Sequence, residues 1–243
     1  MATLRERLAD EVPLVAVSLG DDDSARDAAQ VRALGVDVAE MRVDWFRSVE
    51  PDHVRRELAH YRGLPVLATV RSKTDGGYWP GTEPERQRLY EALLPEVDAI
   101  DIELSAAEIL PSVVAAAKAR GKLVLVSHHD FAETPPAERL GEIAEGAKAA
   151  GADLVKISTM AHSVEDVRLL TAFTLQYRSM GLIVIAMGAQ GAASRVFFPL
   201  LGSRITYSAL GDGDLHAPGQ LPFAETVRLL GRFSPKFAEL RRD

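Results

Sequence analysis

A lysine lies inside an apolar segment, where a charged side chain is costly to bury. Lys156 belongs to residues 152–158, which are rich in β-branched side chains and typical of a buried strand. A buried ammonium group must find partners or lose its proton, and the uncharged amine is a nucleophile that forms an imine with a ketone or an aldehyde. The alternative is a lysine that reaches solvent or pairs with a carboxylate such as Asp153, although the odd spacing places Asp153 on the opposite strand face.

Other strand-like segments also end in polar side chains. They supply Glu40 and Arg42, Arg71, Asp101 and Glu103, and His128 and His129. Alternate residues of a strand point to the same face, so Glu40 and Arg42 share one face. A purely structural ion pair between these two is an alternative. Polar side chains at so many strand ends nevertheless favour one shared site.

Eight strand-like segments alternate along the chain with eight helical patterns. The strand-like segments are residues 13–19, 36–43, 65–70, 99–104, 122–127, 153–158, 182–187 and 205–209. The helical patterns are residues 24–34, 51–60, 83–94, 106–119, 136–149, 163–179, 193–200 and 222–233. Eight successive strand–helix units predict an α/β fold, a (β/α)8 TIM barrel that occupies residues 1–243 as a single domain.

In such barrels the active site lies at the carboxyl ends of the strands, which is where the polar side chains above fall. A doubly wound open sheet is the structural alternative. That fold would carry a Gly-rich phosphate-binding turn after the first strand, and residues 18–23 read SLGDDD instead.

Composition narrows the classes of partner. The net charge is -7, with 28 basic and 35 acidic side chains interspersed, so we expect no nucleic-acid partner. There is no cysteine, which excludes disulfides, thiolate catalysis and cysteine metal sites. The charged N-terminus lacks the apolar core of a signal peptide, and no apolar run approaches membrane-spanning length. We therefore expect a cytoplasmic protein with no membrane partner.

Seven segments together resemble the type I 3-dehydroquinate dehydratases, (β/α)8-barrel enzymes of the shikimate route. They are EMRVDWF at residues 40–46, TVRS at 69–72, DIEL at 101–104, SHHDF at 127–131, VKI at 155–157, MGAQGAASR at 187–195 and APGQ at 217–220. They follow the order of the family and span nearly the whole chain. The resemblance implies dehydration of 3-dehydroquinate, a small anionic substrate, to 3-dehydroshikimate. It also implies no metal or other cofactor, and a homodimer.

The resemblance assigns the two catalytic positions to Lys156 and His129. Lys156 would form an imine with the substrate ketone, because a protonated imine accepts electrons better than a ketone does when the α proton is removed. The attacking amine must be uncharged, and we expect burial and nearby arginines to favour that form. His129 would be the general acid–base. His128 is the competing histidine, which strand alternation turns outward if His129 points inward.

The resemblance also implies a set of substrate contacts. Arg195 matches the arginine that holds the substrate carboxylate, and Arg42 and Arg71 match arginines that line the pocket. Glu40 matches a carboxylate that hydrogen-bonds a ring hydroxyl. Gln220 matches the glutamine of the loop that closes over the site.

Two positions depart from the family pattern. Asp75 stands where the family often has a glutamate that orients the histidine, and its side chain is one methylene shorter. His216 stands at a position where the family usually has a serine that contacts the substrate. We expect Glu103, like Asp75, to support the site. The alternatives to a dehydratase are another Schiff-base barrel lyase of aldolase type and a non-catalytic module that binds a metabolite.

Overall fold

Parallel strands form the centre of the protein. The structure, a computed structural model, describes residues 3–211 and 219–241. The strands are β1 (Leu14–Leu19), β2 (Val38–Arg42), β3 (Val66–Thr69), β4 (Ala99–Glu103), β5 (Leu123–Asp130), β6 (Leu154–Met160), β7 (Leu182–Met187) and β8 (Ile205–Ser208). They pair in the order β7-β6-β5-β4-β3-β2-β1-β8. Almost every strand residue is buried, because side chains pack on both faces of the sheet.

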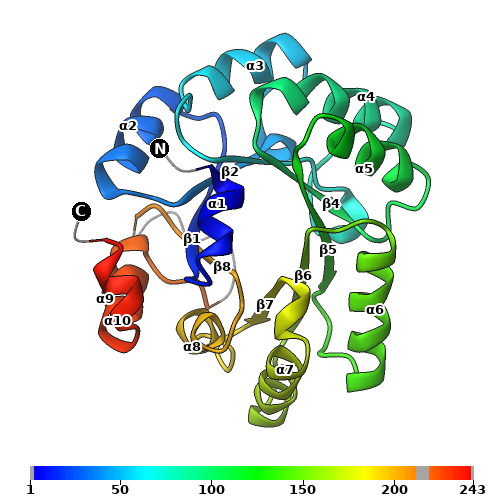
Figure 1. Ribbon diagram of the computed structural model, residues 1–243. Coiled ribbons are helices and arrows are strands. Elements are labelled where there is room, and N and C mark those ends of the chain that lie inside the picture. Colours follow the sequence, from blue (N-terminus) through cyan, green and yellow to red (C-terminus); the bar gives the residue numbers. More distant parts are fainter. Residues whose placement is uncertain (1–2, 212–218, 242–243) are drawn as a thin grey trace.

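The two ends of this sheet approach each other and nearly close it. The backbone N–H of Arg204, just before β8, donates to the carbonyl of Leu182 in β7 at 2.7 Å. The Ser203 hydroxyl accepts from the N–H of Val184 at 3.0 Å. It takes the place of the backbone carbonyl that a neighbouring strand would otherwise supply. The predicted (β/α)8 TIM barrel is therefore confirmed, with its seam between β7 and β8 (Figure 1).

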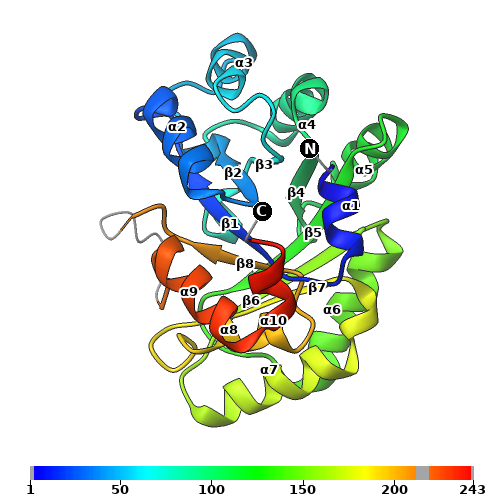
Figure 2. The same ribbon diagram turned by 60° about the vertical axis from the view of Figure 1, so that its left-hand side comes forward.

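Helices surround the barrel as an outer layer (Figures 1 and 2). They are α2 (Ser24–Leu34), α3 (Pro51–Ala59), α4 (Glu83–Leu93), α5 (Leu110–Ala119), α6 (Ala137–Ala149), α7 (Val164–Gln176), α8 (Ser194–Leu200) and α9 (Phe223–Phe233). Each corresponds to a helical pattern in the sequence, with ends shifted by at most a few residues. None of the helices in the described part of the chain is long and apolar enough to cross a membrane.

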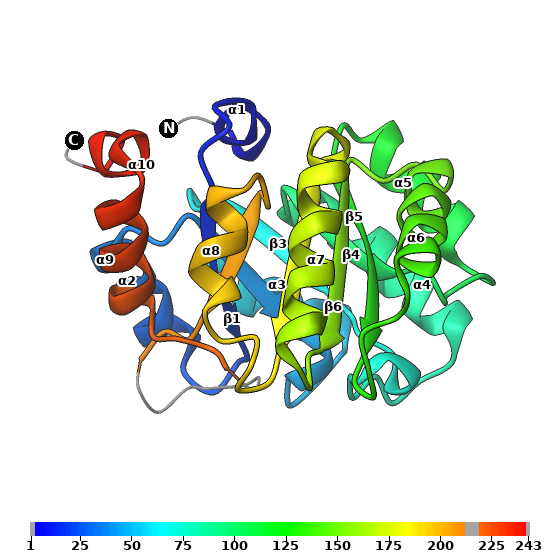
Figure 3. The same ribbon diagram turned by 90° about the horizontal axis from the view of Figure 1, so that it is seen from below.

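Two short helices that the sequence patterns did not predict lie at one end of the barrel. They are α1 (Leu4–Ala9) and α10 (Pro235–Glu239), and Figure 3 shows both at the same end. Leu4 of α1 is 2% exposed and packs into the interior cluster that also holds Leu14 and Leu154. In the described part of the chain, this apolar packing covers the amino ends of the strands, opposite the carboxyl ends where barrel enzymes bind their ligands.

Aspartates at the amino ends of β2, β4 and β6 hold the preceding strands. Asp37, Asp98 and Asp153 each accept a hydrogen bond from the first backbone N–H groups of β1, β3 and β5 at 2.8–2.9 Å. Asp153 also pairs with Lys118 at 2.6 Å. The alternative in which Asp153 neutralises Lys156 is therefore wrong: Asp153 caps the opposite end of the barrel.

Strands β5 and β6 extend further than the apolar pattern predicts. Their pairing continues through Ser127 with Lys156, His129 with Ser158, and Asp130 with Thr159. The sequence pattern ended the fifth strand at residue 127, because polar side chains follow it. In the barrel the hydrogen-bonded ladder continues through these polar residues, and it holds His129 within a regular strand that faces the cavity.

Candidate active site

A cavity of about 560 Å³ opens at the carboxyl ends of the strands, large enough for a small metabolite. Six of the residues selected from the sequence line it: Glu40, Arg42, His129, Lys156, Arg195 and Gln220. Further lining side chains include Ser18, Asp44, Trp45, Tyr78, Phe131, Ser158 and Tyr207. His216 lies outside the residues that the structure describes.

The Lys156 side chain is buried on the cavity floor and touches two carboxylates. Its Nζ lies 3.2 Å from Asp101 Oδ2 and 3.5 Å from Glu40 Oε1. It also faces the ring of Tyr207, at 4.1 Å from the ring centroid. The sequence analysis expected arginines beside the amine, whereas both of these ion-pair partners are carboxylates. An ammonium held in this way must pass a proton to a neighbouring base before it can attack a carbonyl.

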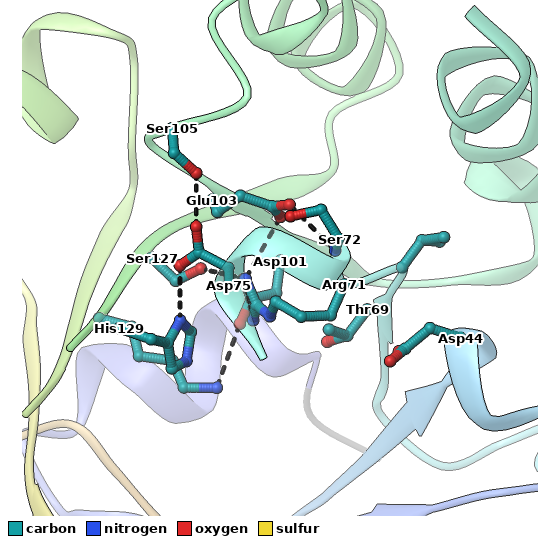
Figure 4. Close-up of polar contacts among 12 residues, drawn as sticks. Asp44, Thr69, Arg71, Ser72, Asp75, Asp101, Glu103, Ser105, Ser127 and His129 are labelled. Carbon is teal, nitrogen blue, oxygen red and sulfur yellow. Dashed lines mark hydrogen bonds and ion pairs between the residues drawn. The ribbon is translucent and has the colours of Figure 1, made fainter. Parts of the chain in front are cut away.

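Asp101, a strand-end residue to which the sequence assigned no individual role, connects the lysine to Arg71 and Ser127. Its other carboxylate oxygen lies 2.8 Å from the Arg71 guanidinium and accepts from the Ser127 hydroxyl at 2.6 Å (Figure 4). Burial opposes ionisation, but the charges of Arg71 and Lys156 outweigh it and hold the pKa of Asp101 well below its usual range. One signal for Asp101 was available, since it shares a strand face with Glu103.

Arg71 is buried beside the cavity in a network of ion pairs. It is 3% exposed, contacts Asp101 and Glu103, and donates to Ser127 at 2.6 Å. The described residues that line the cavity do not include it. Glu103 in turn pairs with the fully buried Arg86. Positive and negative charges thus alternate from Arg86 to Lys156. Such buried pairs are rigid, because breaking one leaves a buried charge without a partner.

His129 is held by a carboxylate from a different loop. Its Nδ1 lies 3.3 Å from Asp75 Oδ1, and Asp75 also accepts from the Ser105 hydroxyl (Figure 4). A carboxylate only accepts, so Nδ1 carries the hydrogen and Nε2 is left as the basic nitrogen. Burial, followed by the charge of Arg71, lowers the pKa of His129 to about 4, against the opposing effect of Asp75. The imidazole is therefore uncharged near neutral pH and can accept a proton.

The loop that carries Asp75 reaches His129 because two glycines follow it. Gly76 has a φ of 76°, in the left-handed region, and a Cβ there would lie 2.5 Å from the Phe131 ring. A Cβ on Gly77 would lie 2.3 Å from the Arg71 carbonyl oxygen. In this chain Asp75 makes the contact with His129 that the family pattern assigns to a glutamate.

Glu40 and Arg42 do not pair with each other as one alternative proposed. Arg42 makes a bidentate pair with Asp44, at 2.9 and 2.7 Å, and stacks over the Trp45 ring at 4.1 Å. Glu40 accepts from the hydroxyls of Ser18 and Thr69 and faces Lys156. Although burial opposes ionisation of Glu40, the charges of Lys156 and Arg42 lower its pKa. Both side chains are thus held rigidly at the cavity.

Arg195 and Gln220 reach the cavity from the segments after β7 and β8. Arg195 is the second residue of α8 and is 3% exposed. Burial lowers its pKa to about 10, so it remains a cation near neutral pH. Gln220 follows Gly219, whose φ is 76° and where a Cβ would lie 2.6 Å from the Gly188 carbonyl oxygen. The two segments therefore pack against each other through a glycine.

His128 precedes His129 in β5 and does not line the cavity with it. Strand alternation places the two imidazoles on opposite faces, as expected. Among the described residues, no group of three His, Cys, Asp or Glu side chains is arranged to hold a metal ion.

Comparison with known proteins gives the same picture as the geometry. The sequence profile described as type I 3-dehydroquinase matches residues 5–234. The 3-dehydroquinate dehydratase of Methanosarcina acetivorans is 43% identical over 206 residues, which cover 81% of this chain and 85% of that protein. The crystal structure of the Geobacillus kaustophilus 3-dehydroquinate dehydratase has a TM-score of 0.86 at 30% identity and covers 92% of this chain and 91% of that one. The type I enzyme of Clostridium difficile, solved with covalently modified comenic acid, has a TM-score of 0.86 at 28% identity and covers 93% of each chain. The chain therefore belongs to the type I 3-dehydroquinase family.

Proposed function

We propose that this protein converts 3-dehydroquinate to 3-dehydroshikimate and water through an imine at Lys156. The observation that supports this most directly is a buried amine and an uncharged, carboxylate-held imidazole on the wall of one cavity. These are the two groups that an elimination next to a ketone requires, an electron sink and a base.

The proposed sequence of steps begins with loss of a proton from the ammonium to a neighbouring base. The free amine attacks the ketone, and the carbinolamine loses water to give a protonated imine. His129 then removes the proton α to the imine carbon and returns a proton to the departing hydroxyl, which leaves as water. Hydrolysis of the product imine releases the ketone and restores Lys156.

Arg195 is proposed to hold the substrate carboxylate, with Glu40, Arg42 and Gln220 as contacts for its hydroxyls. A charge-assisted hydrogen bond is worth about 1.5–3 kcal/mol, or about 10- to 100-fold in affinity. Arg195→Met should therefore raise KM by about that factor, with a smaller change in kcat. Arg195→Lys keeps the charge but loses the bidentate geometry, so its KM should be intermediate. Equal KM values for the Met variant and the wild type would contradict this role.

The pH dependence of the reaction should report the protonation of His129. Because the pKa of His129 is lowered to about 4, the base is present above that pH and lost as pH falls through it. We expect kcat/KM to rise from about pH 4 and to level off well below pH 7. Asp75→Asn removes a charge that favours the imidazolium, so it should move the acidic limb of the pH profile to lower pH. It should also reduce kcat by about 10- to 100-fold, because His129 is less well oriented. Asp75→Glu, a conservative control, should retain both the limb and most of kcat.

The activity itself is tested by incubating the purified protein with 3-dehydroquinate and following the ultraviolet absorbance of the conjugated product. Cleavage of the substrate into two carbonyl fragments would instead indicate an aldolase-type lyase. Saturable binding without turnover would indicate a metabolite-binding module.

We also propose that the protein acts in the cytoplasm as a homodimer. The family resemblance supports the dimer, and so do exposed apolar side chains on the neighbouring helices α7, α8 and α9 (Figure 3). They are Val164, Leu175, Phe197, Leu200 and Phe233. Sedimentation velocity at micromolar concentration should give the mass of two chains, and a single species of 26.4 kDa would contradict the dimer.

A further inference from the structure

Tyr207 lies against the reactive amine, yet its hydroxyl has no hydrogen-bond partner among the described residues. The side chain projects from β8, is 4% exposed and lines the cavity. Its ring faces Lys156 Nζ at 4.1 Å from the centroid. Its oxygen is fully buried. The hydroxyl is thus out of reach of a molecule in the cavity, and the ring face is the part of Tyr207 that the amine contacts.

We propose that Tyr207 is a further active-site residue, whose ring face stabilises the cationic nitrogen at Lys156. This inference rests on the proposed imine chemistry and adds a residue to it. No role for this position followed from the sequence analysis, where residues 205–209 were read only as the last strand.

The number of hydrogens on Nζ changes during the reaction, whereas the contact of Nζ with the ring does not depend on them. The ammonium carries three N–H donors, and here it contacts Asp101, Glu40 and the Tyr207 ring. A protonated imine keeps the positive charge but has a single N–H, so it can donate to only one of the two carboxylates. The negative face of an aromatic ring attracts a cation without needing a donor. Its contribution therefore persists when a hydrogen bond is lost.

Two substitutions test the ring. Tyr207→Phe keeps the ring, so it should form the borohydride-trapped adduct at Lys156 at close to the wild-type rate. Tyr207→Leu removes the ring and should slow adduct formation by about 3- to 10-fold. In the Tyr207→Phe background, ring-fluorinated phenylalanines should lower the rate progressively, because fluorine withdraws electron density from the ring face.

A matched control comes from another buried tyrosine. Tyr61 is fully buried in the core between the sheet and the helices and does not line the cavity. Tyr61→Phe should leave the adduct rate unchanged, and thermal unfolding of all variants would show whether each retains the fold.

The ring role is overturned if Tyr207→Leu forms the adduct at the same rate as Tyr207→Phe, or if fluorination has no effect. Failure of the underlying chemistry is distinguishable, because the wild-type protein itself would then form no adduct with 3-dehydroquinate.

Discussion

Lys156→Ala should abolish both the borohydride-trapped adduct and turnover. The substitution removes the nitrogen that accepts electrons from the α carbon, and no other described lysine lines the cavity. We expect kcat to fall by a factor on the order of 10⁴ or more, as for removal of other covalent nucleophiles. The measurement is mass spectrometry of the protein reduced with borohydride in the presence of 3-dehydroquinate, followed by peptide mapping.

Lysines elsewhere in the fold provide the controls for that experiment. Lys118 pairs with Asp153 at the amino ends of the strands, Lys148 donates to the backbone of Ala152, and Lys236 donates to the backbone of Asp10. Lys118→Ala should therefore retain the adduct and near-normal turnover. An adduct on any of these three, or none at all in the wild-type protein, would refute the assignment to Lys156.

His129→Ala should separate imine formation from elimination. The variant keeps Lys156 and its carboxylate partners, so some imine should accumulate, while the α proton has no base to receive it. We expect kcat to fall by about 10² to 10⁴, the usual contribution of a general acid–base. The trapped mass should be that of the substrate adduct, whereas an enzyme that completes the elimination traps the product adduct as well.

His128→Ala is the matched control, since it removes the adjacent imidazole of the same strand. This histidine does not line the cavity, so its loss should leave kcat within a few-fold of the wild type. A variant series in which His128→Ala is inactive and His129→Ala is active would mean that the inward face of β5 has been assigned incorrectly.

The alternation of apolar and polar residues was sufficient to predict the barrel and most of the cavity wall. Side chains two apart on a strand share a face, and the strands of a barrel converge at their carboxyl ends. These local rules grouped Lys156, Glu40 and the histidines of the fifth strand at one site before their distances were known. They also showed that His128 and His129 point to opposite faces, and the family resemblance selected His129 as the inward one.

Which groups touch one another was decided only by the tertiary structure. Asp101 and Lys156 are 55 residues apart, and Asp75 and His129 are 54 apart. Their contacts depend on strand register, on loop path and on the close approach that Gly77 permits, and no periodicity in the sequence records these. The same is true of Arg71, which the family resemblance assigned to the pocket lining. In the folded chain, its guanidinium pairs with Asp101 and Glu103.

The sequence by itself determined the fold, the inward faces of the strands and the chemistry that their side chains could perform, because backbone geometry makes those properties local. The tertiary structure decided the charge state and surroundings of the site: two carboxylates at the amine, a largely uncharged His129, and an aromatic face at Tyr207. Those properties depend on burial and on charges a few ångströms away, and folding brings together groups from strands that are far apart in the chain.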